Sequence, residues 1–252
     1  MPTEKERFVS RKTLAIAFLS LAYAAPAQAG DTANLSVLGF SKDGKVFAFE
    51  EYGIQDGSGF PYSNRFYVDI AKDDFVAGTP IRVLFEDEIK PLYAVRAQVG
   101  EKGNAILSNQ ELAENPGFLA GFNAVTEVSA DPHHMVVNPR PVFPPIDANM
   151  EVLLEEFPLK GPNFCDGGVG PTKGYRLIGI HTKDGGKTEM LHEDTSIPQS
   201  RGCATGYRIG GVQTFFTPDD KMAYAVLITV IRQGFEGPDH RWIANTGYWA
   251  GE

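Results

Sequence analysis

Few residues of this 252-residue chain stand in a pattern that supports catalysis. Ser58 lies between two glycines, but the nucleophile elbow needs glycine two residues to either side of the serine, and position 56 is an aspartate. Ser58 is therefore predicted to be a turn residue. The stretch from Gly168 to Gly174 is glycine-rich like a phosphate loop, but its spacing is wrong and a proline stands where a backbone N–H should point. We expect an ordinary loop there.

The five histidines give little support for a metal site. His133 and His134 are adjacent, so in an extended chain they point to opposite sides and cannot chelate one ion together. Asp131 and His133 share a side, but such a pair needs further ligands to hold a metal. His181 and His192 flank an Asp-Gly-Gly turn, and folding the hairpin about this turn predicts imidazoles on opposite faces. We expect no metal and no cofactor.

Acidic doublets such as Glu50-Glu51, Glu155-Glu156 and Asp219-Asp220 are frequent in a chain with 32 acidic residues. Glycosidases need two carboxyl groups about 5 to 9 Å apart across a cleft, and the fold sets that distance, not proximity in sequence. Sequence-adjacent acids usually lie at strand ends or in turns. No catalytic residue is assigned, and a secreted hydrolase whose two carboxylates are brought together by the fold stays as an alternative.

The first 29 residues have the pattern of a signal peptide. A basic start is followed by the uncharged stretch Thr13 to Ala25, and Ala27-Gln28-Ala29 supplies the small residues that signal peptidase requires. The basic residues are Lys5, Arg7, Arg11 and Lys12. The uncharged stretch is shorter than the roughly 20 residues that cross a bilayer. We expect cleavage after about Ala29 and a secreted or periplasmic domain formed by residues 30–252.

The remaining chain is strongly acidic. The chain has 23 Lys and Arg residues and 32 Asp and Glu residues. The predicted signal peptide contains four of the basic and two of the acidic residues, so 19 basic and 30 acidic residues remain. This balance argues against nucleic acid and against anionic membrane surfaces as partners. The longest later apolar run, Met222 to Ile231, is too short to span a bilayer. An unknown periplasmic protein or a small ligand is the expected partner.

Two cysteines in an exported chain usually form a disulfide. Cys165 and Cys203 both lie in glycine-containing loops, where the backbone can adopt the geometry that a disulfide requires. We therefore predict a Cys165–Cys203 disulfide. The alternatives are two buried thiols, or one nucleophilic cysteine and a second cysteine that takes no part in the chemistry.

The hydrophobic pattern repeats every second residue through most of the chain, which indicates β-strands. The expected strands are Leu35–Phe40, Val46–Tyr52, Phe66–Ile70, Ile81–Phe85, Val152–Phe157, Tyr175–Ile180, Thr188–His192, Arg208–Phe215, Met222–Ile231 and Arg241–Thr246. Helical spacing appears only at about residues 87–114, where Ser108 and Glu111 resemble a capping box. The proline-rich segment Asn138–Pro145 is expected to be an extended connection.

An internal repeat links the two ends of this β region. The segment Phe40–Lys45 (FSKDGK) recurs as Phe216–Lys221 (FTPDDK), 176 residues later. A Gly-Phe pair and then an arginine before an aromatic residue follow in both copies. The FSKDGK turn resembles the inter-strand turns of WD-repeat-like propeller blades. We expect a mainly β fold, either propeller-like or a sandwich of antiparallel strands, with the short helical insertion at 87–114.

The order of segments resembles a family of predicted secreted bacterial proteins that share a conserved domain of unknown function. The resemblance lies in Gly39–Gly53, in the string from Gln55 to Tyr62 (QDGSGFPY) and in Gly234–Asp239. It implies secretion and a single domain, and it carries no activity and no functional residues.

Two long loops are the candidate binding region. Gln55–Asn64 and Arg232–His240 leave equivalent strand ends of the repeat, and loops on a rigid β scaffold commonly carry binding residues. The candidate binding residues are Tyr62, Arg65, Asp239, His240 and Arg241. Alternatively, the two arginines pair with Asp56 and Asp239 and only hold the loops closed. The sequence favours a non-enzymatic envelope protein that binds a partner or small ligand.

The position of cleavage is directly testable. Protein taken from its native compartment should begin at Gly30 or within a few residues of it, because Ala27-Gln28-Ala29 is the best peptidase site after the uncharged stretch. Amino-terminal sequencing decides this, and a retained Met1 would contradict export by a cleaved signal peptide.

Overall fold

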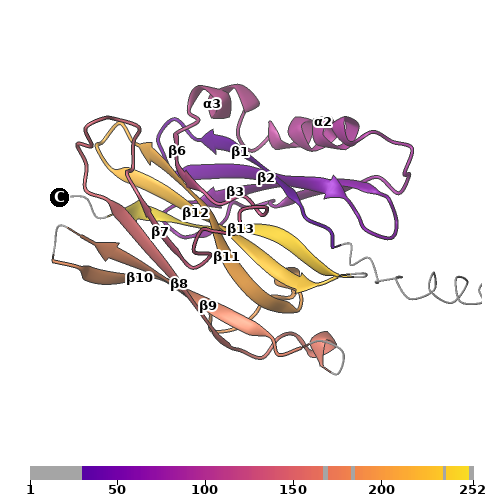
Figure 1. Ribbon diagram of the computed structural model, residues 1–252. Coiled ribbons are helices and arrows are strands. Elements are labelled where there is room, and N and C mark those ends of the chain that lie inside the picture. Colours follow the sequence, from indigo (N-terminus) through magenta and orange to yellow (C-terminus); the bar gives the residue numbers. More distant parts are fainter. Residues whose placement is uncertain (1–29, 167–169, 183–184, 235–236, 250–252) are drawn as a thin grey trace, which may run out of the picture.

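In the computed structural model of the protein, antiparallel β-sheets are stacked in three layers (Figure 1). The described residues are 30–166, 170–182, 185–234 and 237–249. The predicted signal peptide lies outside them, as do parts of the predicted loops at 167–169, 183–184 and 235–236. The mainly β fold with a helical insertion is confirmed, and of the two expected arrangements the sandwich is the one observed.

Each layer has its own strands. The helix-covered sheet contains β1 (Asn34–Phe40), β2 (Val46–Ile54), β3 (Pro61–Asp69), β4 (Asp74–Phe75) and β5 (Ile81–Leu84). The middle sheet contains β6 (Phe118–Phe122), β11 (Ala204–Phe216), β12 (Met222–Gln233) and β13 (Pro238–Trp249). The outer sheet contains β7 (His134–Val137), β8 (Met150–Pro158), β9 (Lys173–His181) and β10 (Lys187–Glu193).

The middle sheet is buried on both faces, which explains why β12 is apolar at nearly every position. Its side chains alternate between two cores, because successive residues of a strand point to opposite faces. One set, Ala223, Ala225 and Leu227, packs against the helix-covered sheet. The other set, Met222, Tyr224, Val226, Ile228 and Val230, packs against the outer sheet. The apolar run noted in the sequence is thus the shared core of two sheet interfaces.

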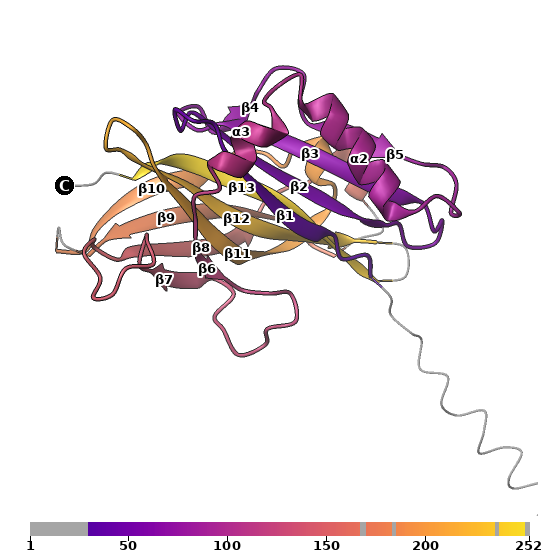
Figure 2. The same cartoon turned by 90° about the horizontal axis from the view of Figure 1, so that it is seen from above.

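Two α-helices cover the free face of the helix-covered sheet, as Figure 2 shows from above. α2 (Leu92–Gly103) packs on β3 and β5, and α3 (Asn109–Glu114) packs on β1. The Ser108 hydroxyl caps α3 by accepting the backbone N–H of Glu111 at 3.1 Å. The Glu111 carboxylate accepts the backbone N–H of Lys42 at 2.9 Å, which ties α3 to the β1–β2 turn. Within the described residues, neither helix is long and apolar enough to cross a membrane.

The two copies of the internal repeat form equivalent turns, one between β1 and β2 and the other between β11 and β12. In each turn a hydroxyl, of Ser41 or Thr217, accepts the backbone N–H of the residue four positions later at 3.0 Å. The strands before the turns also meet, since the Phe40 and Phe215 rings stack with centroids 5.1 Å apart. The meanders β1–β3 and β11–β13 therefore face each other across one core and do not stand side by side like propeller blades.

The expectation that His181 and His192 point to opposite faces is wrong. A β-bulge between Met190 and His192 shifts the register, so His192 stands opposite Leu177 and Lys187 stands opposite His181. Directly opposed residues share a face, and Leu177 and His181 lie on the same face of β9. Both imidazoles therefore face the middle sheet. One extra residue is enough to reverse the side on which a strand residue points.

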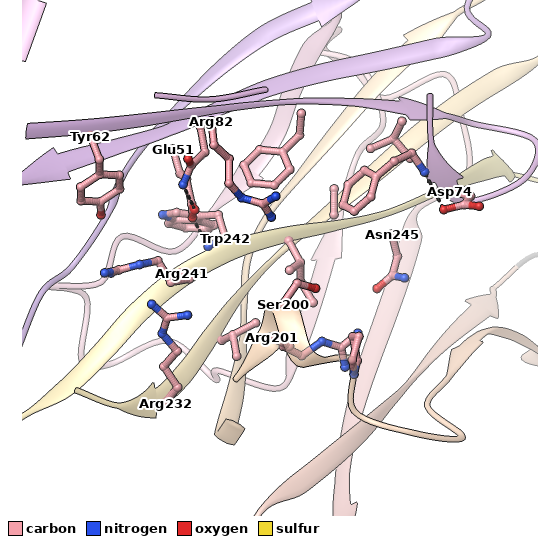
Figure 3. Close-up of a pocket in the computed structure, with 18 of the residues that line it drawn as sticks. Glu51, Tyr62, Asp74, Arg82, Ser200, Arg201, Arg232, Arg241, Trp242 and Asn245 are labelled. Carbon is pink, nitrogen blue, oxygen red and sulfur yellow. Dashed lines mark hydrogen bonds between the residues drawn. The ribbon is translucent and has the colours of Figure 1, made fainter. Parts of the chain in front are cut away.

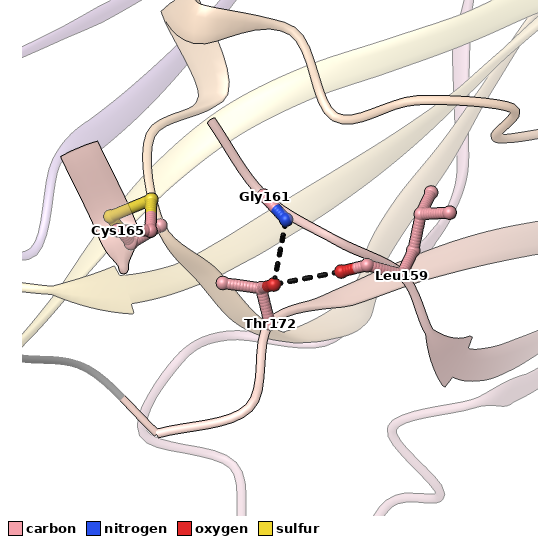
Figure 4. Close-up of a disulfide and its surroundings, with 5 residues drawn as sticks. Leu159, Gly161, Cys165 and Thr172 are labelled. Atoms are coloured by element: carbon pink, nitrogen blue, oxygen red, sulfur yellow. Dashed lines mark hydrogen bonds between the residues drawn. A yellow bond between two sulfur atoms is a disulfide. The ribbon is translucent and has the colours of Figure 1, made fainter. Parts of the chain in front are cut away.

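Cys165 and Cys203 are joined by a disulfide, with their Cα atoms 5.6 Å apart. The bond closes a separation of 38 residues, which in the chain-entropy model stabilises the fold by roughly 4 kcal/mol. It connects the short helix η1 (Asn163–Cys165) to the segment between η2 (Gln199–Arg201) and β11. Thr172 fixes the loop around η1 by accepting from Gly161 N at 2.9 Å and donating to Leu159 O at 2.7 Å (Figure 4).

The two equivalent turns should respond differently when the residue at the same turn position is replaced. Gly44 and Asp220 occupy the same turn position with φ of +67° and +59°. A Cβ on Gly44 would lie 2.3 Å from the Thr217 side chain, so Gly44→Ala should lower the free energy of unfolding by about 1–3 kcal/mol. Asp220→Gly relieves a left-handed backbone and should change it by less than about 1 kcal/mol. Urea unfolding measures both, and equal effects would contradict the contact between the turns.

Candidate functional site

A cavity of about 550 Å³ lies where the three sheets approach one another (Figure 3). Its walls come from β3 and β5 of the helix-covered sheet, from β13 of the middle sheet, and from β9, β10 and η2 on the outer-sheet side. Aromatic side chains form much of the wall: Tyr62, Phe66, Phe75, Tyr175 and Trp242. Tyr62, Phe66 and Trp242 belong to the core of one sheet interface and Tyr175 belongs to the core of the other. The two cores therefore hold most of the wall in place.

Four arginines also line the cavity, and they come from separate segments. They are Arg82 on β5, Arg201 on η2, Arg232 on β12 and Arg241 on β13. Figure 3 shows Arg82 reaching toward the cavity from the helix-covered sheet and Arg232 and Arg241 reaching toward it from the middle sheet. The residues that neighbour each arginine in sequence do not predict this cluster, because only folding brings the four segments together.

Arg241 is held by acids that stand behind it. Its guanidinium pairs with Asp31 at 2.6 Å and with Asp239 at 3.5 Å, and it lies over the Tyr62 ring with its carbon 5.3 Å from the ring centroid. The Tyr62 hydroxyl donates to Asp31 at 3.4 Å. Burial raises the pKa of Asp31, although Arg241 opposes that rise. Burial likewise raises the pKa of Tyr62.

The structure brings Tyr62, Asp239 and Arg241 together, but the expectation that they lie in long loops is wrong: Tyr62 lies on β3 and the other two lie on β13, because the strand pairing extends into both segments. The alternative pairing of Arg241 with Asp239 is present, with Asp31 as the closer partner. His240 is half-buried next to them and bridges to Thr32 in a short parallel pairing. Burial, and then the charge of Arg208, lower the pKa of His240.

Arg65 lies outside the cavity, on the opposite face of β3. Only 6% exposed, it faces the helices, donates to Asn109 and lies 3.5 Å from Glu50. Arg96 pairs with the same Glu50 carboxylate at 2.8 Å. Arg65 thus pairs with Glu50 and not with Asp56, because an odd-numbered residue of β3 points away from the face that carries Tyr62.

Asp73 connects all three sheets at one end of the cavity. It lies in the β3–β4 turn and accepts hydrogen bonds from Asn245 Nδ2 at 2.8 Å and from Thr246 N at 2.6 Å, both on β13. His192 of β10 lies 3.7 Å from the same carboxylate and bonds Asp194 at 3.0 Å. No pattern in the sequence predicts this junction, because it joins three segments that are distant along the chain.

His192 is a cation at neutral pH. Burial alone would lower its pKa, but hydrogen bonds and charges from Asp194 and Asp73 outweigh burial and raise the pKa to about 9. Asp194 in turn bonds Arg201 at 2.6 Å. Burial tends to raise the pKa of Asp194, and these two cations bring the net shift downward. Arg201 and His192 are thus fixed at the cavity wall by one carboxylate.

The carboxylates that line the cavity bond to the protein itself. Glu51, only 5% exposed, accepts the backbone N–H of Trp242 at 2.9 Å and the Asn64 amide at 3.0 Å. Asp73 is engaged in the sheet junction, and Asp74 accepts the backbone N–H of Phe75 at 2.7 Å. These acids hold strands and turns in place, and this arrangement gives little support for a catalytic pair.

The remaining histidines bond to separate partners. His133 Nε2 lies 3.0 Å from the Tyr207 carbonyl oxygen, and His134 Nε2 lies 2.8 Å from Glu151. The turn assignment of Ser58 agrees with its bonds to Gln55 and to the Phe60 N–H. Within the described residues, no three His, Cys, Asp or Glu side chains gather as a metal site requires.

Comparison with known families gives one match. The model of a family described as "Predicted secreted protein (DUF2259)" matches residues 48–247. No curated protein and no solved structure matches the chain. The matched range covers β3, β5, η2 and β13, so the cavity lies almost entirely within it.

The Asp73–His192 contact predicts a pH-dependent stability. Because the pKa of His192 is raised on folding, its contribution is fully present below about pH 6.5 and is lost as the pH rises through about 9. With partial exposure discounted, we expect a loss of about 2 kcal/mol over this range. Urea unfolding at pH 6 and pH 9 measures it.

Two variants separate this effect from other titrations. Asp73→Asn keeps a side chain that tolerates the left-handed backbone at this position, and it should both lower stability at pH 6 and reduce the pH dependence. His192→Gln should abolish the His192 contribution. Asp74→Asn is the control at the next position and should preserve the wild-type difference. An unchanged pH profile in His192→Gln would overturn the assignment.

Proposed function

The chain belongs to this family of predicted secreted proteins, and from that premise we propose that it is an exported periplasmic protein that binds a small molecule in the cavity and is not an enzyme. The mature protein starts near Gly30 and forms one β-rich domain. The observation that carries the proposal is the cavity of about 550 Å³ enclosed by elements of three sheets.

The cavity has the size and lining that a small-molecule site requires. Such sites span about 300–1,000 Å³ and combine apolar walls with a few placed polar groups. Here aromatic and aliphatic side chains alternate with arginines whose positions are fixed by acids behind them. The disulfide anchors the segment that carries η2, so this wall also is held in place.

The chemistry of the lining supports binding over hydrolysis. A two-carboxylate hydrolase needs acids that face the substrate with free lone pairs and a suitable separation. The cavity acids Glu51 and Asp73 instead accept backbone and amide hydrogens across the sheet interface. A hydrolase remains the alternative, and turnover of a captured ligand would favour it.

A blocking variant tests the proposal. Ser200 is an exposed side chain on η2 that lines the cavity, so Ser200→Trp should fill the mouth without disturbing a core. Native mass spectrometry of protein isolated from the periplasm should show a bound small molecule in the wild type and its loss in Ser200→Trp. The neighbouring exposed residue Gln199 does not line the cavity, and Gln199→Trp should retain the ligand.

With the ligand removed, the melting temperatures of both variants should match that of the ligand-free wild type. Retention of the ligand by Ser200→Trp, or loss by both variants, would contradict binding in this cavity.

A further inference from the structure

We infer that the ligand is an anion, a small molecule that carries a carboxylate or phosphate group on an apolar body, with its acidic group bound by Arg82 and Arg232. This rests on the proposed function, because it names the class of ligand for the same cavity. The inference comes from the charge of the lining, the unused donors of two arginines and the apolar remainder of the wall.

The lining is richer in cations than the protein as a whole. The chain has a net charge of −9, yet four arginines and one histidine line the cavity against only three carboxylates. The three lining acids, Glu51, Asp73 and Asp74, each accept a hydrogen bond from a backbone N–H group. Positive groups concentrated in a concave, partly desolvated site attract an anion more strongly than the same groups on an open surface.

Arg82 and Arg232 have the weakest internal partners among these arginines. Among the described residues, no carboxylate lies within ion-pair distance of Arg82. Within the described ranges, Arg232 has one ion-pair partner, Asp239, at 3.5 Å, and that carboxylate is shared with Arg241. Both therefore keep most of their N–H donors free, and a planar guanidinium matches the paired oxygens of a carboxylate or phosphate.

Arg201 and Arg241 have a different role in ligand binding. Each is paired at 2.6 Å with an acid behind it, Asp194 or Asp31, which fixes its guanidinium at the wall. Their charges are largely balanced, so they shape the site and leave the direct contact with the anion to Arg82 and Arg232. Arg82 reaches the cavity from β5 of the helix-covered sheet and Arg232 from β12 of the middle sheet, so both point their guanidinium groups into the space between these sheets.

The rest of the ligand should be apolar. Phe66, Val68, Phe75, Val83 and Ile243 line the cavity together with Trp242. This part of the surface offers dispersion and hydrophobic contact and few hydrogen bonds, so a polyol would leave the hydroxyls that face it unpaired. The complementary ligand combines one anionic end with an aromatic or aliphatic body.

Trp242 supplies a reporter for the test. The chain has two tryptophans, and of these Trp242 lines the cavity whereas Trp249 packs against His181 and Tyr224. In a Trp249→Phe background, the emission of Trp242 reports occupancy of the cavity by any probe. Three probes share one body: phenylacetate, phenyl phosphate and the neutral phenylacetamide.

We expect at least one of the two anions to bind on the order of tenfold more tightly than the amide, as a charge-assisted hydrogen bond implies. The tighter anion identifies the acidic group. Arg82→Gln should remove this preference while the amide still binds, and raised salt should weaken only the anions. Arg176→Gln is the matched control, because Arg176 lies on β9 outside the cavity and pairs with Glu155 and Glu193.

The outcomes separate the two proposals. If the amide binds as tightly as both anions, the cavity is a binding site and the anion inference is overturned. An anion preference that persists in Arg82→Gln and in Arg232→Gln also overturns it. If none of the probes changes the emission of Trp242, the anion inference fails, and loss of the native ligand in Ser200→Trp still decides the proposed function independently.

Discussion

The carboxylate of Asp73 is the point at which the three sheets are fixed to one another. It sits in a turn of the helix-covered sheet, accepts hydrogens from Asn245 and Thr246 of the middle sheet, and faces the His192 imidazolium of the outer sheet. A partly buried acid with this many partners is costly to leave unpaired, so it selects one relative placement of the sheets. The cavity has walls from the same three sheets, and its shape therefore depends on this junction.

The two meanders of the repeat share one core but have different surroundings. β1–β3 carry helices on the face away from the shared core, whereas β11–β13 carry the outer sheet there, so both meanders are covered on both faces but by different partners. This asymmetry explains the composition of β12, which lacks the polar alternation of a half-buried strand. It also places Arg65 and Arg241, matched in sequence, in unrelated environments: one beneath the helices and the other in the cavity.

Local patterns predicted the local structure well. The ten expected strands, both repeated turns and the Ser108 cap follow from short-range chemistry that the sequence displays directly, and the even cysteine count predicted the disulfide, whereas the short strands β4, β6 and β7 were not expected. The bulge near His192 could not be predicted, because one unpaired residue in β10 is decided by how the outer sheet packs. For the site, the two segments after the repeated turns led to Tyr62, Asp239 and Arg241, but Arg201 lies far from Asp73 and Arg82 in sequence and comes to the same cavity only through sheet stacking.

The cavity wall formed by η2 connects the shape of the site to the redox conditions of the compartment in which the protein folds. Ser200 and Arg201 lie in a segment without strand pairing, and the bonds of Arg201 to Asp194 and Tyr207 together with the nearby Cys203 disulfide help to hold it. Disulfides persist in oxidising compartments and are rare in reducing ones. Without the bond, the chain-entropy cost of ordering this segment rises, and the Arg201 side of the wall loses its covalent anchor. The description of the family as predicted secreted proteins fits this dependence, because an oxidising compartment is where the disulfide that anchors this wall persists.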